Sequence, residues 1–157
     1  MSSWQRGRAA IERLLEEGRL ERLQQPAALE WGAQQLGVCE RQLDSARTVA
    51  DGDPDSAFTL AYDAARKAAA VLLQMQGLRA RAQGSHATVA EAAAEQFDGP
   101  FERLNRYRRM RHTVEYPTPH DAGVAEEDVA VALGDAAAMV ETARQLVASG
   151  RLAPWRS

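Results

Sequence analysis

The residues best suited to do chemistry in this sequence are arginines, five of which fall within one short segment. Residues 101–111 read FERLNRYRRMR and contain a single acid, Glu102, so the segment carries a charge of +4 while the whole chain carries −3. A cationic segment on an acidic protein is typical of a binding site for phosphate, a nucleotide or an RNA backbone. The alternative is a solvated helix face whose arginines pair with acids on neighbouring helices. The candidate binding residues are Arg103, Arg106, Arg108, Arg109 and Arg111.

A second feature follows directly, because residues 111–116 read RHTVEY, and an alanine-rich segment, AYDAARKAAAVLLQMQGLR, lies upstream at residues 61–79. Together with the arginines and the order of the helices, these segments resemble the HEPN family, the small helical domains of prokaryotic nucleotide-binding and RNA-processing proteins. The family motif lies near the end of a late helix. It is an arginine, usually followed by a polar residue, with a histidine four to six positions after the arginine. The resemblance covers roughly residues 27–148 and implies a helical bundle that pairs as a homodimer.

The family motif can be aligned with this sequence in two ways. In the preferred alignment Arg111 is the motif arginine, His112 is the polar residue after it, and Tyr116 stands where the family has its histidine. In the alternative, Arg106 is the arginine and His112 is the histidine. The first is preferred because it places the motif at the end of the helix and keeps a polar residue after the arginine, whereas Tyr107 follows the arginine in the second.

The chemistry that the resemblance implies is RNA cleavage without a metal ion. A histidine would take the proton of a ribose 2′-hydroxyl, and the arginine would stabilise the charge of the phosphorane. In the preferred alignment Tyr116 is a poor base, because tyrosine has an ordinary pKa of about 10 and is neutral at pH 7. That alignment predicts binding of RNA or nucleotide phosphate with little or no cleavage, whereas the alternative restores His112 as a base. The sequence therefore supports both a toxin-type endoribonuclease and a relative that binds without cleaving.

A different class of function is a non-catalytic interaction module. Some HEPN relatives partner a nucleotidyltransferase in toxin–antitoxin pairs, and Tyr116 would then be a candidate for modification. A third interpretation is a bundle whose arginines only make salt bridges. No cofactor is expected, and a metal site is not expected either, because the sequence has one cysteine and three scattered histidines.

The elements that must position these residues are predicted to be helices. Alanine supplies 31 residues while valine, isoleucine and threonine together supply 17, a balance that favours helix over strand. Gly18 weakens the first predicted helix, so two short turns are an equal alternative there. Residues 79–85 are predicted to be a loop, and Thr88 with Glu91 fits a capping box after it. Apolar periodicity and the breaks at glycine and proline predict helices at 8–23, 27–50, 55–76, 88–97, 101–116 and 126–148.

These helices predict an all-α protein, an up-and-down bundle of four to five helices that is HEPN-like by resemblance. We expect a short helical N-terminal extension at residues 1–25, the bundle at 26–150 and a tail at 151–157. Hydrophobic residues make up 45% of the 157 positions, which suits one domain with a single core. No apolar run reaches the roughly 18 residues of a membrane span, and residues 1–8 lack the apolar stretch of a signal peptide. We therefore expect a cytoplasmic protein that does not associate with membranes.

The remaining chemistry-bearing side chains are given structural roles. Cys39 falls on the apolar stripe of its helix and is predicted to be buried. Tyr62 and Asp63 lie on the alanine-rich helix, where a structural role is favoured over ligand binding. His86 is predicted to be a loop or capping residue, and His120 falls in a loop.

Overall fold

The computed structural model describes residues 4–97 and 99–156. The regular secondary structure of this part of the chain is helical apart from one short pair of strands. Residues 1–3 of the predicted N-terminal extension and Ser157 of the predicted tail lie outside the described residues. The predicted all-α class is confirmed. No helix in the described part of the chain is apolar over a length that would cross a membrane. In chain order the elements are α1 (Arg8–Glu16), β1 (Leu20–Arg22), α2 (Leu29–Val49), α3 (Pro54–Met75), β2 (Leu78–Ala80), α4 (Ser85–Phe97), the 3-10 helix η1 (Gly99–Arg103), α5 (Leu104–Glu115) and α6 (Glu126–Ser149).

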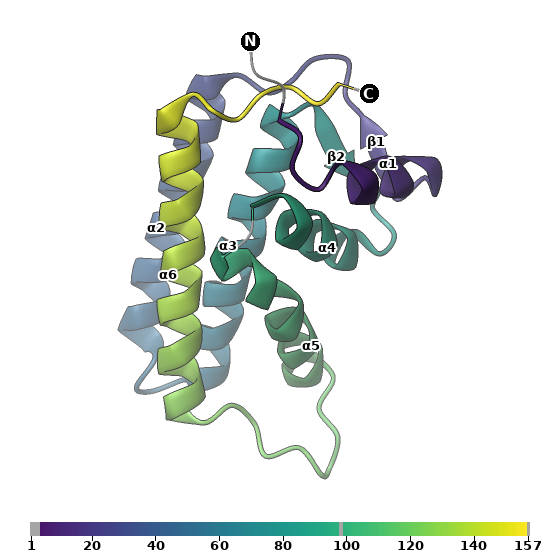
Figure 1. The fold of residues 1–157 in the computed structure, drawn as a ribbon. Coiled ribbons are helices and arrows are strands. Elements are labelled where there is room, and N and C mark those ends of the chain that lie inside the picture. Colours follow the sequence, from purple (N-terminus) through teal and green to yellow (C-terminus); the bar gives the residue numbers. More distant parts are fainter. Residues whose placement is uncertain (1–3, 98, 157) are drawn as a thin grey trace.

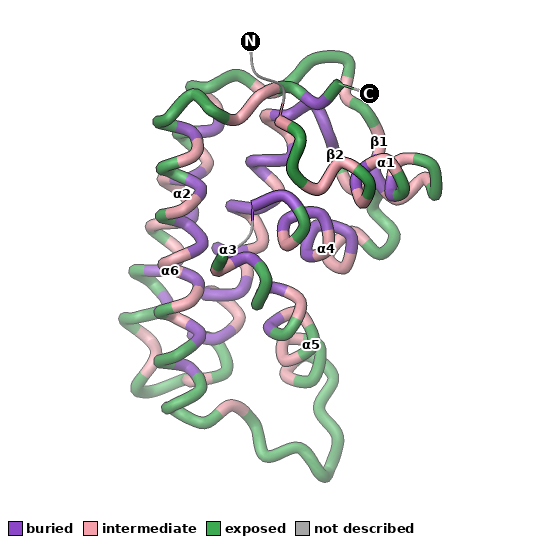
Figure 2. The backbone as a smooth tube through the Cα atoms, in the orientation of Figure 1, coloured by how far each residue is buried: buried purple, intermediate pink, exposed green. Residues whose placement is uncertain are grey.

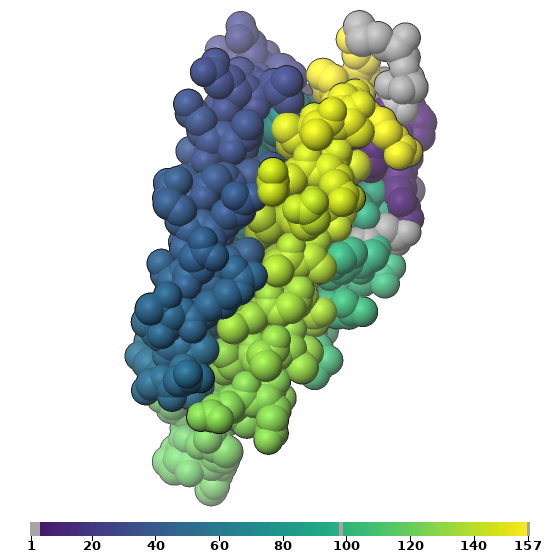
Figure 3. Space-filling model, turned by 90° about the vertical axis from the view of Figure 1, so that its left-hand side faces the viewer, coloured from purple at the N-terminus to yellow at the C-terminus, as the bar shows by residue number. Residues whose placement is uncertain are grey.

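Three long helices form the body of the molecule, with α3 in the middle. α2 runs opposite to α3, and α6 runs in the same direction as α3 (Figure 1). α2 and α6 lie side by side and form one face of the molecule (Figure 3). α4 and α5 pack against α3 on its other side, and α5 runs back towards the loop that leads into α6 (Figure 1). Because α3 is covered on both sides, most of its alanines are buried: Ala57, Ala61, Ala64, Ala65, Ala68 and Ala69.

The ends of α3 and α6 are fixed by capping residues that the sequence pattern marks. Asp53 precedes α3, and its Oδ1 accepts a hydrogen bond from the backbone N–H of Ser56 at 3.2 Å, with Pro54 in the first helical position. α6 ends at Gly150, whose φ of 66° is the left-handed conformation that glycine adopts at low cost. These ends define the two helices that hold α5 in place.

The first predicted helix is too long, because its second half forms a strand. α1 ends two residues before Gly18, which takes a φ of 72° and turns the chain. Leu20–Arg22 then pairs antiparallel with Leu78–Ala80, a segment that begins the predicted loop. Glu21 faces Arg79 in this pair although 58 positions separate them in the sequence, so local periodicity could not reveal it.

The predicted capping box of Thr88 and Glu91 is wrong, because α4 begins earlier, at Ser85. Thr88 is buried inside the helix. Glu91 instead forms ion pairs with Arg13 and Arg19, which come from the N-terminal part of the chain. Two cationic partners satisfy the carboxylate more strongly than a backbone N–H at the helix end.

The helix predicted at 101–116 begins with the 3-10 turn η1 and becomes α-helical only afterwards. Phe101 in this turn is fully buried and packs edge-on against Phe97 of α4, with ring centroids 5.7 Å apart. The helix ends just before Tyr116, because a residue that precedes a proline, here Pro117, is disfavoured in helical geometry. η1 therefore anchors the start of α5 to the rest of the protein.

One cluster of apolar side chains connects the helices of the described chain, and Figure 2 shows it as the buried inner side of each helix. Ile11 and Leu14 of α1 are fully buried in it, so the N-terminal segment packs onto the bundle.

Cys39 is buried as predicted, and burial raises the pKa of its thiol to about 11, which keeps it protonated at pH 7. Near the C-terminal end of α3, Gln76 and Gln96 exchange two buried hydrogen bonds of 2.7 and 2.9 Å.

Candidate functional site

The arginine-rich helix α5 is fixed to the body of the protein by one side. Leu104 and Tyr107 are buried on this side, and the Tyr107 ring lies 6.1 Å from the ring of Phe58 on α3. The Tyr107 hydroxyl donates a hydrogen bond to the carboxylate of Asp135 on α6. The same carboxylate pairs with Arg103, whose Nη1 lies 3.0 Å from Oδ1. Arg103 is therefore paired with an acid at the start of the helix, and the other arginines occupy the remaining sides of α5.

Three of the predicted binding residues hold charges that no acid in the described chain neutralises. The side chains of Arg106 and Arg109 are exposed and have neither an ion-pair nor a hydrogen-bond partner among the described residues. Arg108 is half-buried and donates from Nε to Oδ1 of Asn105 at 2.8 Å, a neutral partner that leaves its positive charge uncompensated. These three guanidinium groups are the ones available to an external anion.

Arg111 differs from them, because its side chain turns towards α3. Its Cζ lies 6.0 Å from the ring centroid of Tyr62, and its Nε is 4.0 Å from Oδ1 of Asp63. It also pairs with Glu115, one turn further along α5. Arg66 of α3 lies 4.0 Å from the same Asp63 oxygen, through Nη2. The Nε atoms of Arg66 and Arg111 are both buried, and neither has a hydrogen-bond partner within the described chain.

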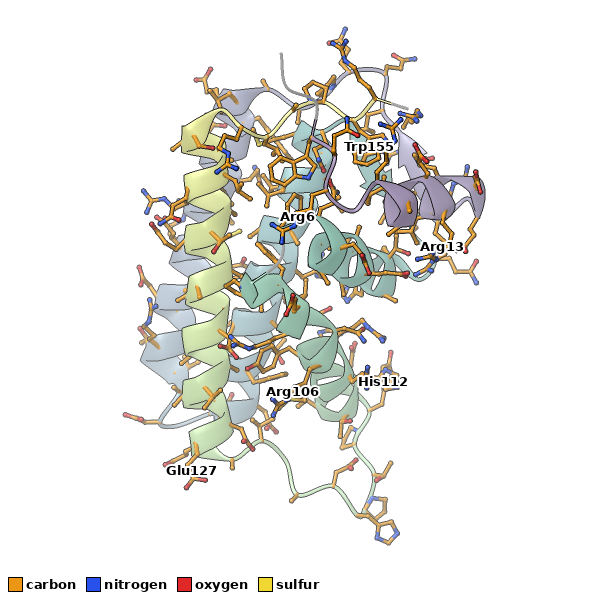
Figure 4. The ribbon with its side chains drawn as sticks, in the orientation of Figure 1. Arg6, Arg13, Arg106, His112, Glu127 and Trp155 are labelled. Carbon is orange, nitrogen blue, oxygen red and sulfur yellow. The ribbon has the colours of Figure 1, made fainter. Side chains whose placement is uncertain are left out.

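His112 and Tyr116 lie at the exposed end of α5. Their rings contact one another, with centroids 4.9 Å apart, and Tyr116 is 62% exposed. Arg111 turns inward while Tyr116 is at the surface, and Arg106 and His112 project from different sides of α5 (Figure 4). The residues of either motif alignment therefore do not gather at one point of this chain.

A polar cluster that the sequence analysis did not single out lies where α3, α4 and α5 meet. His86, the second residue of α4, shares a hydrogen bond of 3.1 Å between its Nδ1 and the hydroxyl of Tyr62, and the two rings lie 5.8 Å apart. Arg111 approaches the same Tyr62 ring from α5. The α3–α5 polar cluster is defined here as Tyr62, Asp63, Arg66, His86, Arg111 and Glu115.

The protonation states in this cluster follow from burial and from the two arginines. Burial lowers the pKa of His86 below its ordinary value, and the charges of Arg66 and Arg111 lower it further. Burial also raises the pKa of Tyr62 to about 12. At pH 7 the cluster therefore holds a neutral imidazole and a protonated phenol beside two guanidinium groups.

The sequence carries only a partial signal for this cluster. Tyr62 and Arg66 are four positions apart, so they share one face of a helix that is otherwise rich in alanine. A polar stripe on a central helix is a reason to look for a ligand or a partner. The approach of His86 and Arg111 to this stripe is a tertiary contact, and no local pattern predicts it.

Two cavities of opposite character border α3, one beside β2 and α4 and the other beside α5. A small cavity of about 160 Å³ is lined by Arg66, Arg79 and Ser85 among others, next to the turn that bears His86. A larger cavity of about 410 Å³ lies between α5 and the loop that follows it. Its polar lining is acidic and includes Asp55, Asp121 and Asp128. Only the first cavity suits an anion.

The described residues hold no group of three or more His, Cys, Asp or Glu side chains that could bind a metal ion. Comparisons with protein-family models, with curated proteins and with solved structures gave no match to this chain. The arginines of α5 and the α3–α5 polar cluster are therefore the features from which a function can be inferred.

Proposed function

We propose that this protein binds RNA through its phosphate backbone, using the arginines of α5. The observation that carries the proposal is the unneutralised charge of Arg106, Arg108 and Arg109, three guanidinium groups on one twelve-residue helix. In a chain of net charge −3, acids are abundant enough to pair with a purely structural helix face, as Asp135 does with Arg103. Several unpaired guanidinium groups along one helix suit a polyanion better than a single phosphate.

The resemblance to HEPN domains supports the same proposal and extends it to a homodimer. The alanine-rich α3 is the central helix, and residues 111–116 follow the arginines at the end of a late helix, the place of the family motif. In the proposed dimer the α5 helices of two subunits border one cleft, related by a twofold axis. Light scattering should then give twice the monomer mass of 17.2 kDa, and a monomer at micromolar concentration would contradict the dimer.

The salt dependence of RNA binding tests the proposed function. Arg106→Gln/Arg109→Gln should weaken binding of a labelled single-stranded RNA, because fewer counterions are released. The slope of log affinity against log salt should fall by about 1.4, since each phosphate contact contributes about 0.7 for single strands. Arg13→Gln/Arg19→Gln is the matched control, because it removes two arginines already paired with Glu91. Equal slopes in both variants and the wild type would contradict RNA binding by α5.

A non-catalytic module that partners a nucleotidyltransferase is the second candidate, and the exposure of Tyr116 favours it. The ring lies at the surface and is followed by the fully exposed segment 117–123, so its hydroxyl is open to a modifying enzyme. Protein isolated from its own cells would then carry an added nucleotide mass that Tyr116→Phe lacks. Intact-mass spectrometry that finds no addition on the wild type would count against this candidate.

A further inference from the structure

The smaller of the two cavities, of about 160 Å³, lies where the chain leaves α3 through β2 and returns to it as α4 (Figure 1). Arg66 in the C-terminal half of α3 and Arg79 on β2 both line it, as does Ser85, the first residue of α4. No acidic side chain of the described residues lines this cavity. Its charged lining is therefore wholly cationic, and it comes from two elements that lie apart in the sequence.

Arg66 is only weakly paired with an acid. Its Nη2 is 4.0 Å from Oδ1 of Asp63, which is beyond hydrogen-bond distance, and Nε of Arg111 lies equally far from the same oxygen. The guanidinium of Arg66 makes no hydrogen bond to another described residue, its Nε is buried, and its side chain is 26% exposed. A donor that is withdrawn from water without gaining an acceptor is unfavourable. Arg66 is therefore the residue of this cavity that gains most from an external acceptor.

Arg79 is held in place by an acid and still keeps free donors. Oε1 of Glu21 accepts a hydrogen bond from Nε of Arg79 at 2.8 Å and another from its Nη2. The other oxygen of Glu21 lies 3.7 Å from Nε of Arg81, so one carboxylate serves two arginines. Nη1 of Arg79 has no partner among the described residues. Because Glu21 fixes the orientation of the side chain, Nη1 is available to a ligand at a reduced entropic cost.

The start of α4 adds neutral donors to these cations. The hydroxyl of Ser85 has no hydrogen-bond partner among the described residues. The first N–H groups of a helix lack acceptors within the helix, and its N-terminal end carries a partial positive charge. Burial lowers the pKa of His86, the next residue, and the charges of Arg66 and Arg111 lower it further. The positive potential of the arginines thus extends to the start of α4.

The size of the cavity and the number of its donors select the kind of anion. A tetrahedral oxyanion can accept hydrogen bonds from Arg66, Arg79 and Ser85 at once, whereas a carboxylate has only two oxygens. The volume of about 160 Å³ exceeds the roughly 30 Å³ of one water molecule but is below the roughly 300 Å³ at which pockets for larger organic ligands begin. Leu73 and Val89 add an apolar part to the lining. The cavity therefore suits a phosphate group with a few carbon atoms and is too small for a nucleotide.

We propose that this cavity binds the phosphate group of a small molecule, which is either inorganic phosphate or a small phosphomonoester. Arg66 and Arg79 offset the charge of the phosphate, and Ser85 donates its hydroxyl to a phosphate oxygen. Leu73 and Val89 contact the carbon atoms of a monoester. This site belongs to α3, β2 and α4, so it is separate from the RNA phosphates proposed for α5 and does not depend on RNA binding.

Nitrogen–proton correlation NMR of the full chain locates the phosphate. Titration with inorganic phosphate at constant ionic strength should shift the Nε–H resonance of Arg66 and the backbone amides of Ser85 and Val89, with one saturating curve. Acetate should need at least about tenfold higher concentrations, because it offers fewer acceptors. Methyl phosphate distinguishes the two sources: tighter binding than inorganic phosphate identifies a monoester, and weaker binding identifies free phosphate. Small shifts that never saturate, spread over exposed arginines, would overturn the site.

The decisive variant is Arg66→Gln, which keeps an amide donor but removes the charge. It should weaken phosphate binding about tenfold or more, while circular dichroism stays unchanged. Arg144→Gln is the matched control, because it changes an α6 arginine that pairs with Glu40 at 3.0 Å and does not line the cavity. Wild-type affinity in Arg66→Gln would overturn the proposal. If Arg66→Gln does not fold, Arg79→Gln at the exposed edge of the cavity should weaken binding about threefold or more, and wild-type affinity there would overturn it equally.

The α5 variant separates this site from the proposed RNA-binding helix. Arg106→Gln/Arg109→Gln should lose RNA affinity and keep phosphate binding, whereas Arg66→Gln should do the reverse. Loss of phosphate binding in the α5 variant alone would place the phosphate on α5 and overturn the inference, while RNA binding stands. A wild type that binds phosphate in the cavity but does not bind RNA would refute the proposed function and leave this site intact.

Discussion

Arginines around α1, the strand pair and α4 form ion pairs with glutamates, whereas most arginines of α5 do not. Arg19 lies 2.9 Å from Glu91, and Arg79 pairs with Glu21 across the two strands. Arg106 and Arg109 on α5 have no such partner in the part of the chain that the structure describes. Both regions belong to a chain in which 18 of 19 basic residues are arginine, so the difference lies in placement and not in residue type.

The placement of acids along the sequence explains this difference. Residues 8–22 contain four glutamates and four arginines, which allows pairs within a helix turn and across to neighbouring elements. Residues 101–111 contain only Glu102 against five arginines. Paired charges cancel locally, whereas unpaired ones produce a field that extends about 8 Å at physiological salt. The N-terminal region thus uses arginine to join its elements, and α5 keeps charge available for an external anion.

The largest effect is expected from the side chain that anchors α5. Phe101→Ala should lower the free energy of unfolding by about 3–5 kcal/mol, because Phe101 is fully buried against Phe97. The start of α5 would be released, so RNA affinity should fall as the arginines lose their common orientation. Thermal unfolding and an RNA titration below the melting temperature measure the two effects. Val131→Ala, which shortens an exposed side chain of α6, should change neither. Wild-type affinity in folded Phe101→Ala would show that the arginines act without their scaffold.

Much of the helical fold could be predicted from the sequence, because the signals that start and stop a helix are local. Asp53 with Pro54 marks the beginning of α3, and Gly150 marks the end of α6, as the structure has them. The strand pair could not be predicted, because Glu21 and Arg79 meet across a long separation in the chain. Each strand is only three residues long, too short for an alternating pattern.

The candidate site could be predicted only as a charge cluster. The segment 101–111 is visible in the sequence, but which arginines are free depends on tertiary partners. Arg103 is paired with Asp135, 32 positions away, and Arg111 turns inward to Tyr62. His86 has no distinguishing neighbours in sequence, and its place beside Arg111 arises from the packing of α4 and α5 on α3.

A smaller effect is expected when an acid is removed from the paired region. Burial raises the pKa of Glu91, but the hydrogen bonds and charges of Arg13 and Arg19 together outweigh burial and lower it. A folded-state pKa below the unfolded value stabilises the protein above about pH 4.3, and this stabilisation is lost as the pH falls through the folded-state pKa. Glu91→Gln should therefore cost about 1 kcal/mol at pH 7, a fall of about 2–4 °C in melting temperature, and much less at pH 3.

Unfolding of wild type and Glu91→Gln at both pH values measures this cost. An equal cost at pH 7 and pH 3 would mean that the interaction of Glu91 with its arginines is not ionic.

The same variant leaves Arg13 and Arg19 without this carboxylate, so the N-terminal region gains uncompensated positive charge, as α5 has. At low salt Glu91→Gln should then bind RNA slightly more tightly than the wild type, and unchanged binding would show that unpaired charge alone does not make a site.

The smallest effect is expected from a change at Asp135, the acid that pairs with Arg103 next to the unpaired arginines of α5. Asn in its place keeps an oxygen that accepts from the hydroxyl of Tyr107 but removes the charge that pairs with Arg103. The ion pair is largely exposed on the side of Arg103, so Asp135→Asn should cost less than about 1 kcal/mol. Arg103 would then join Arg106 as an unpaired cation, and the salt slope of RNA binding should steepen by at most about 0.7. Salt titrations of both proteins with one RNA decide the point. If Asp135→Asn lowers the stability but leaves the salt slope of RNA binding unchanged, Arg103 has only a structural role, like the paired arginines of the N-terminal region. Arg106 would then be the first arginine of the segment that contacts RNA.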